Sequence, residues 1–154
     1  MADIDRMPLP TPSSASPDPA GDTARAYALL AGTAHGRVAT SMRALPFLAT
    51  AHHVLADGRL LLRMHRGTGY HQACVGSVVA YGADNLGARE AAGGEWSVQL
   101  VGLCEAVRPS DGELLLFGPV PGRMDGEPYD PVYLRIEPQF ITVHTADPAP
   151  SPGD

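Results

Sequence analysis

An Asp57-Gly58 pair between two apolar stretches is the feature that most constrains how this chain can fold. An Asp-Gly pair accepts the positive φ angles of a type I′ turn, the two-residue turn that joins neighbouring antiparallel strands. The flanking stretches, residues 46–56 and 59–64, have the length and apolar content of strands. The sequence therefore predicts a β-hairpin in this part of the chain.

The length of this turn also fixes which residues pair across the hairpin. With a two-residue turn, Ala56 pairs with Arg59, and pairing outward places His52 opposite Arg63. Directly opposed residues share a face of the sheet. One face, predicted to point into the core, carries Ala51, His53, Leu55, Leu60, Leu62 and Met64. The other carries His52, Val54, Leu61 and Arg63, which places an imidazole beside a guanidinium at the open end of the hairpin.

Further strands are expected on both sides of the hairpin. Apolar stretches predict strands over 37–41, 77–83, 96–107, 131–137 and 139–145, with a bulge at Gly82 and a break at Pro138. Three short helices are expected. The first has its N-cap at Asp22 or Thr23 and stops at Gly36, and the second spans Tyr70–Cys74. The third spans Gly112–Phe117 after a cap at 109–111, and a loop follows over 118–130. About six strands with mostly antiparallel connections predict a mainly β fold, a small barrel with short peripheral helices.

Composition is that of one globular domain. The chain has 154 residues, of which 44% are apolar and 18% charged. We expect the domain to span residues 22–146, between flexible tails rich in Pro, Ser and Ala at 1–21 and 147–154. The net charge of −6 argues against a nucleic-acid partner, and no apolar stretch has the length of a membrane span. Without an apolar signal-peptide core, the expected location is the cytoplasm.

The chain contains no lysine, because all 11 basic residues are arginine. This excludes chemistry that needs a Schiff base to a lysine amine, and any anion site must use Arg, backbone N–H groups and hydroxyls. Such groups are concentrated in residues 63–70, where Arg63 and Arg66 precede Thr68 and Gly69 at the start of the expected helical turn. The segment predicts a phosphate-binding site. The alternative is a hairpin end with solvated arginines.

An ordered series of motifs carries a family resemblance. The segments GRVATS, PFLATAHHVLADGRLLLR, RGTGY, SVVAYGADNL and EWSVQLVGLCEAV follow one another along the chain. In this order they resemble the pyridoxamine 5′-phosphate oxidase-like family of FMN-binding split barrels, over about Tyr27 to Thr145. The resemblance implies a six-stranded antiparallel split β-barrel, usually a homodimer, with FMN bound at the subunit interface.

The resemblance also implies roles for particular residues. Arg63 and Met64 match the end of the family's phosphate-binding strand, and Gly67-Thr68-Gly69 matches its following loop, which leads to Tyr70. The family usually has lysine where this chain has Gly69, and Arg66 is the candidate to replace that charge. Thr50 and Ala51 match the strand that lies along the flavin ring, and Trp96 matches a strand near the partner subunit's site. The family's Arg/His substrate motif and Arg-Leu-Ala-Pro C-terminus are missing, so the resemblance is to the broad branch and not to the true oxidase.

These observations support several functions. The leading one is an FMN-dependent oxidoreductase acting on a small organic substrate, with His52 as proton donor or substrate contact because it shares the face of Arg63 and imidazole titrates near neutral pH. The alternatives are a binding or non-redox protein on the same scaffold, holding heme, a deazaflavin or a substrate directly, and a structural dimer without ligand.

No metal site is expected. His52 and His53 are adjacent in a strand and point to opposite faces, so they cannot share one ion without distortion. Cys74 and Cys104 are expected to be buried, unpaired thiols.

Overall fold

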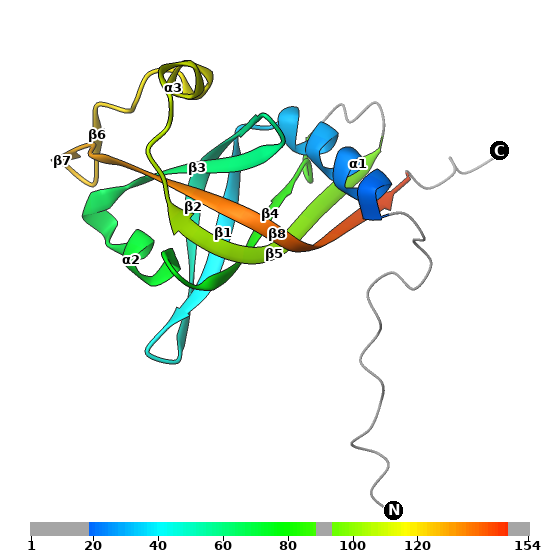
Figure 1. Cartoon of the computed structure of the whole chain (residues 1–154), viewed down its shortest axis with the longest axis horizontal. Coiled ribbons are helices and arrows are strands. Elements are labelled where there is room, and N and C mark those ends of the chain that lie inside the picture. Colours follow the sequence, from blue (N-terminus) through cyan, green and yellow to red (C-terminus); the bar gives the residue numbers. More distant parts are fainter. Residues whose placement is uncertain (1–18, 89–93, 148–154) are drawn as a thin grey trace, which may run out of the picture.

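The computed structural model describes residues 19–88 and 94–147, so the tail predictions for 1–18 and 148–154 lie outside the described residues. Six strands close into a barrel in the order β1-β2-β3-β8-β5-β4, and every neighbouring pair is antiparallel (Figure 1). They are β1 (His35–Met42), β2 (Leu45–Ala56), β3 (Arg59–His65), β4 (Val78–Asp84), β5 (Glu95–Ala106) and β8 (Pro131–Ala146). The predicted fold class is confirmed.

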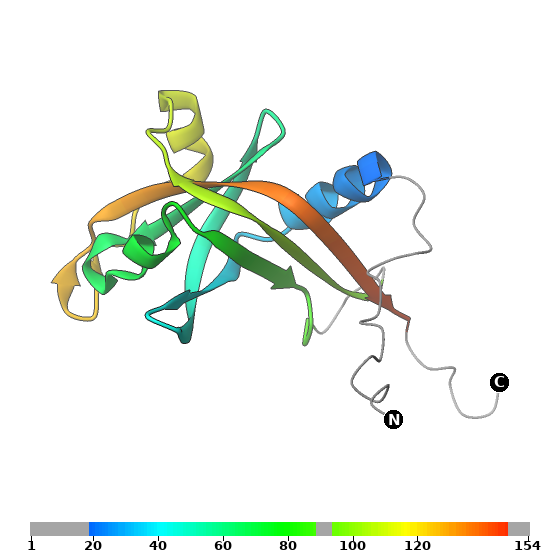
Figure 2. The same cartoon turned by 60° about the horizontal axis from the view of Figure 1, so that its bottom comes forward.

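Short helices and strands lie at the two ends of the barrel. They are the helices α1 (Pro19–Ala31), α2 (Tyr70–Cys74) and α3 (Asp111–Phe117), the 3-10 turn η2 (Arg66–Thr68), and the two-residue strands β6 (Arg123–Met124) and β7 (Glu127–Pro128). In Figure 2, α1 lies at one end, while α2, α3 and the β6–β7 hairpin gather at the other. The end that carries α2 and the β6–β7 hairpin also carries the candidate site.

The predicted hairpin and its register are confirmed. Asp57 and Gly58 have φ angles of 51° and 74°, as a type I′ turn requires, and His52 pairs with Arg63. The face predicted to point inward does so, because His53, Leu62 and Met64 are each at most 3% exposed. Register read from one turn therefore locates the core of the barrel.

A buried histidine connects α1 to the barrel. His53 Nε2 donates to the Leu30 carbonyl of α1 at 2.9 Å, and Nδ1 accepts from the Tyr81 hydroxyl of β4 at 2.5 Å. A carbonyl can only accept, so the ring proton must be on Nε2. Burial lowers the pKa of His53, which keeps the ring neutral and suits these two partners.

On the outer face of the hairpin, α3 builds a second, smaller cluster. Phe117 packs there with Leu61 and Ala56, next to Tyr133 of β8. The helix begins as predicted, with Ser110 capping the Glu113 N–H in a capping box. This cluster borders Arg63, whose guanidinium lies 5.4 Å from the centre of the Phe117 ring.

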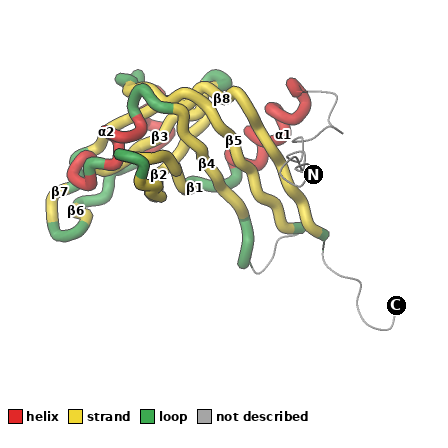
Figure 3. The backbone as a smooth tube through the Cα atoms, turned by 90° about the horizontal axis from the view of Figure 1, so that it is seen from below, coloured by secondary structure: helices red, strands yellow, loops and turns green. Residues whose placement is uncertain are grey.

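Three predictions about the ends and breaks of elements are wrong. Helix α1 ends at Ala31, and Gly36, its predicted stop, lies inside β1. Helix α1 begins at Pro19, so Asp22 and Thr23 lie inside it and are not its N-cap; proline is favoured at a first helical position. The C-terminal strands are one strand, β8, which runs beside β5 through Pro138 (Figure 3).

The bulge occurs elsewhere than predicted. Gly82 pairs regularly with Arg37 and Gln99, whereas the register of β5 and β8 shifts between Val101 and Gly102. Gln139 is the extra residue, since Val101 pairs with Phe140 and Gly102 with Pro138. A bulge lets the ladder pass a proline, which has no N–H to donate.

Gly102 is required at this bulge, and its substitution is a test of the fold. A Cβ at Gly102 would lie 1.9 Å from the Glu137 carbonyl oxygen, which is backbone and cannot move aside easily. Gly102→Ala should lower the free energy of unfolding by about 1–3 kcal/mol or more, measured by urea denaturation. Gly112→Ala in α3 is the control, because its Cβ would meet only Ser110 Oγ at 3.9 Å. Equal stability of the two variants would contradict this role for Gly102.

Candidate functional site

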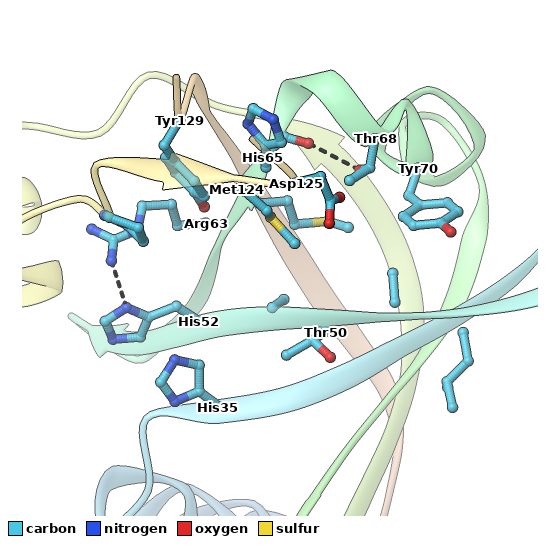
Figure 4. Close-up of a pocket in the computed structure, with 15 residues that line it drawn as sticks. His35, Thr50, His52, Arg63, His65, Thr68, Tyr70, Met124, Asp125 and Tyr129 are labelled. Atoms are coloured by element: carbon cyan, nitrogen blue, oxygen red, sulfur yellow. Dashed lines mark hydrogen bonds between the residues drawn. The ribbon is translucent and has the colours of Figure 1, made fainter. Parts of the chain in front are cut away.

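A cavity of about 430 Å³ lies against the outer face of β2 and β3, beside α2 and beneath residues 118–130 (Figure 4). This volume is in the range of sites for small molecules and cofactors. Residues 118–130, here named the overhanging segment, connect α3 to β8 and include the β6–β7 hairpin. The cavity is lined by His35, Leu48, Ala49, Thr50, Ala51, His52, Arg63, Met64, His65, Thr68, Tyr70, Pro121, Met124, Asp125 and Tyr129.

Arg63 is the central charged group of this cavity and is only 5% exposed. Its Nη1 donates to the Gly118 carbonyl at 3.1 Å, and its Nη2 donates to the Pro119 carbonyl at 3.4 Å. Nη2 also donates to His52 Nδ1 at 2.9 Å, the contact drawn in Figure 4. The buried Nε has no hydrogen-bond partner among the described residues. Arg63 therefore holds the start of the overhanging segment and keeps one N–H group unused.

The Arg63 contact defines the state of His52. A guanidinium only donates, so His52 Nδ1 must be the lone-pair nitrogen and the proton sits on Nε2. Burial and the positive charge of Arg63 lower the pKa of His52 to about 4. The expectation that His52 titrates near neutral pH is therefore wrong, and at pH 7 it is a neutral ring that can donate one hydrogen bond from Nε2.

A second histidine at this end was missed by the sequence reasoning. His35 begins β1 and pairs with His52, and the two ring centres are 5.0 Å apart. Both residues line the cavity. The pairing of β1 with β2 brings the two histidines together, and no motif in the sequence predicts this contact.

The overhanging segment is anchored at its far end too. The Asp130 N–H donates to His65 Nδ1 at 3.0 Å, and the Arg66 N–H donates to the Asp130 carbonyl at 2.7 Å. The Tyr129 ring stacks on His65 with centres 5.0 Å apart. Met124 and Asp125 lie at the turn of the β6–β7 hairpin and line the cavity. The sequence predicted only a loop here, although Asp125-Gly126 is a hairpin signal of the same kind as Asp57-Gly58.

The structure brings together seven of the eleven predicted site residues. Thr50, Ala51, His52, Arg63, Met64, Thr68 and Tyr70 all line the cavity. Arg66, Gly67, Gly69 and Trp96 are not part of its lining. The hydroxyl of Thr68 donates to the His65 carbonyl at 3.0 Å, which closes the η2 turn.

The predicted phosphate loop therefore differs from the expected one. Arg66 is exposed and pairs with Asp130 at 3.4 Å, outside the cavity. Gly69 has a φ of +77°, which L side chains rarely adopt, so a lysine at this position would strain the backbone. Gly67 makes room for the His65 ring, since a Cβ there would lie 2.5 Å from His65 Nε2. The three residues shape the turn rather than line the cavity.

Trp96 and the cysteines lie elsewhere. Trp96 is the second residue of β5, where its backbone N–H donates to Asn85 Oδ1, and its side chain packs against the main core. Cys74 and Cys104 are buried and unpaired, as expected, and burial raises their pKa values to about 11 and about 12.

The described residues also bear on metal binding and on membrane spans. Within residues 19–88 and 94–147, no group of three or more His, Cys, Asp or Glu side chains is placed to hold a metal ion. None of the helices in the same residues is long and apolar enough to cross a membrane.

The protein is a small β-barrel with a partly covered cavity of small-molecule size on its flank. A family model described as pyridoxamine 5′-phosphate oxidase matches residues 22–145, so the chain belongs to this family. The resemblance stated from the sequence is confirmed.

Individual proteins are similar to this chain in sequence or in structure. Protein Rv0080 of Mycobacterium tuberculosis, named as uncharacterized, is 37% identical over 91 residues, which are 56% of this chain and 59% of that protein. The chain thus spans less than two thirds of this relative. An FAD-binding protein of Mycobacterium smegmatis has a similar structure, with a TM-score of 0.60, 22% identity, and coverage of 80% of this chain and 96% of the other. An FAD-binding protein of Mesorhizobium loti is also similar in structure, with a TM-score of 0.56 and 17% identity. The match covers 80% of this chain and 94% of the other. At such identities the likeness concerns the fold.

The pKa of His52 predicts a loss of stability in mild acid. Its pKa falls from 6.5 to about 4 on folding, so between these values the unfolded chain binds a proton that the folded protein does not. The free energy of unfolding should therefore fall as the pH drops through this window, with no contribution from His52 above it. Urea unfolding at a series of pH values should show a smaller fall for His52→Gln, which still offers Arg63 an acceptor. Identical pH profiles for the two proteins would contradict the assignment.

Proposed function

We propose that the protein binds a flavin nucleotide in this cavity and is an oxidoreductase for a small organic substrate. The observation that carries the proposal is the unpartnered Nε–H of Arg63, a buried charge-bearing group on a side chain that lines the cavity. A buried donor without a partner costs about 1–3 kcal/mol, and a phosphate oxygen would satisfy it with a charge-assisted hydrogen bond. An anionic ligand thus explains a feature that the protein alone leaves unsatisfied.

The remaining lining suits the rest of a flavin. Met124 is exposed and offers an apolar side chain to a flat ring, and Tyr70 stacks on Phe47 at 5.1 Å to form an end wall. Asp125 lies toward the Thr68 end of the cavity in Figure 4, which disfavours a phosphate there and favours one near Arg63. Support also comes from family membership and from two similar structures that are of FAD-binding proteins. We propose FMN first, and FAD shares the same ring, ribityl chain and first phosphate.

A bound flavin supplies two-electron redox chemistry, and the protein supplies binding and orientation. Arg63 would hold the phosphate, and the neutral His52 would donate a hydrogen bond from Nε2 to the flavin or to a substrate. With a pKa of about 4, His52 orients and polarises its partner and does not act as an acid at pH 7. The absorption spectrum of the purified protein decides between the proposals: flavin bands support this one, a Soret band supports heme, and no chromophore favours direct substrate binding.

Titration with FMN and riboflavin tests the anion site. Wild-type protein should bind FMN more tightly than riboflavin, which lacks the phosphate. Arg63→Met should weaken FMN by roughly ten- to a hundredfold and riboflavin by less, because only FMN loses a charge-assisted contact while both lose the anchored segment. Arg66→Gln is the matched control: its side chain lies outside the cavity, so FMN affinity should change little. Equal affinity of wild type for FMN and riboflavin, or no binding of either, would show the proposal to be wrong.

We further propose a homodimer in which a second copy covers the outer face of the sheet beside this cavity. A row of apolar residues crosses five strands in register: Leu48, Ala39, Ala80, Val101 and Phe140. Its ends are well exposed, at 61% for Leu48 and 63% for Phe140, and the row is about 19 Å long at the usual strand spacing. Leu48 also lines the flavin cavity, so a partner on this face would border the site.

Light scattering on wild type and two variants tests the dimer. Wild type should have the mass of two chains at micromolar concentration, and Phe140→Glu should shift it toward one chain, because burying an unpaired carboxylate in an interface is costly. Leu115→Glu is the control, since this α3 residue is 82% exposed and lies off the row. A monomeric wild type would contradict the dimer.

A further inference from the structure

The Arg63 guanidinium serves two structures at once. Of its five N–H donors, those on Nη1 and Nη2 reach Gly118, Pro119 and His52, and the one on Nε is unused by the described residues. Gly118 and Pro119 begin the overhanging segment. The nitrogens that hold this segment are therefore different from the nitrogen left for a ligand.

The rest of the overhanging segment is held at its far end and within its own tip. Its far end is held by Asp130, through His65 and Arg66 of the β3 end. Its tip is bonded within itself, as Arg123 Nη1 donates to the Gly126 carbonyl at 2.8 Å and the Tyr129 N–H donates to the Gly122 carbonyl at 3.1 Å. Both anchors thus depend on the end of β3, and one of them is the side chain that faces the ligand.

We propose that the overhanging segment is a lid that closes over an anionic ligand, and that Arg63 is the positioning residue that couples the two. This inference rests on the proposed function, because it assigns the anion to Arg63. An anion on Nε–H restricts the Arg63 side chain to the conformation in which Nη1 and Nη2 meet the lid carbonyls. The ligand and the lid both require the same ordered conformation of the Arg63 side chain, so the entropy cost of ordering it is met once. Ligand binding therefore stabilises the closed lid, and the closed lid strengthens ligand binding.

The Arg63 fork is essential to this coupling. A lysine at the same position would keep the positive charge, but its single nitrogen cannot present separate, rigidly spaced donors to two carbonyls and an anion. Arg63→Lys should therefore retain part of the anion affinity and lose the coupling. A purely structural role for Arg63 would not produce this separation.

Hydrogen exchange of peptides covering residues 118–130 measures the lid directly. In wild-type protein, saturating FMN should slow exchange there by about tenfold, within the usual range of coupling between sites, whereas riboflavin should not. In Arg63→Lys, saturating FMN should leave exchange of these peptides unchanged. The matched control is Arg59→Lys on the same strand, which pairs with Glu113 away from the cavity and should behave as wild type. Bound FMN with no slowing in wild type, or equal slowing by riboflavin, would overturn the lid.

Failure of the proposed function gives a different result. If FMN fluorescence shows no binding at all, flavin is the wrong ligand, and inorganic phosphate becomes the probe for the same exchange measurement. Hydrogen exchange of the ligand-free proteins then tests whether Arg63 anchors the lid. Exchange of the lid peptides should be faster in Arg63→Lys than in wild type and in Arg59→Lys. Unchanged lid exchange in Arg63→Lys, together with no effect of phosphate on wild type, would overturn the inference independently of flavin.

Discussion

The hydrogen bonding of one buried guanidinium organises the functional end of this barrel. Arg63 is nearly removed from water, and a buried charge is tolerated only when hydrogen bonds replace its lost hydration. Two carbonyls, a histidine nitrogen and the face of Phe117 supply most of that replacement. The position of the overhanging segment and the tautomer of His52 are consequences of this arrangement, and the Arg63 charge adds to the burial that lowers the pKa of His52.

The part of this arrangement made by one hairpin was predictable from the sequence. The φ angles that Asp57-Gly58 accepts set a two-residue turn, and strand pairing then placed His52 opposite Arg63 without any knowledge of the remaining strands. Period-two alternation likewise identified the inward face, including the buried His53. Local turn chemistry and pairing are short-range effects, so a short stretch of sequence is enough to infer them.

What lies over the hairpin was not predictable. His35 reaches His52 only because β1 pairs with β2, and Met124 and Asp125 reach the cavity only because α3 and β8 fix the two ends of the segment between them. Proximity of this kind depends on long-range packing and leaves no periodic signal. The pKa of His52 was misjudged for the same reason, because the register gave it Arg63 as a neighbour but not the burial that lowers its pKa most.

The absence of lysine has a structural meaning at this position. A lysine ammonium is a compact and strongly hydrated charge, whereas arginine spreads its charge over a planar fork and is desolvated more easily. Only the fork can meet the carbonyls of Gly118 and Pro119 while leaving Nε free. Gly69 is consistent with this, because its positive φ fits the turn before α2 and strains any lysine that would bring a second cation. In the proposed site, recognition of an anion would depend on one arginine whose geometry is fixed by the segment it holds, so the arginine fork would couple ligand affinity to closure of the site.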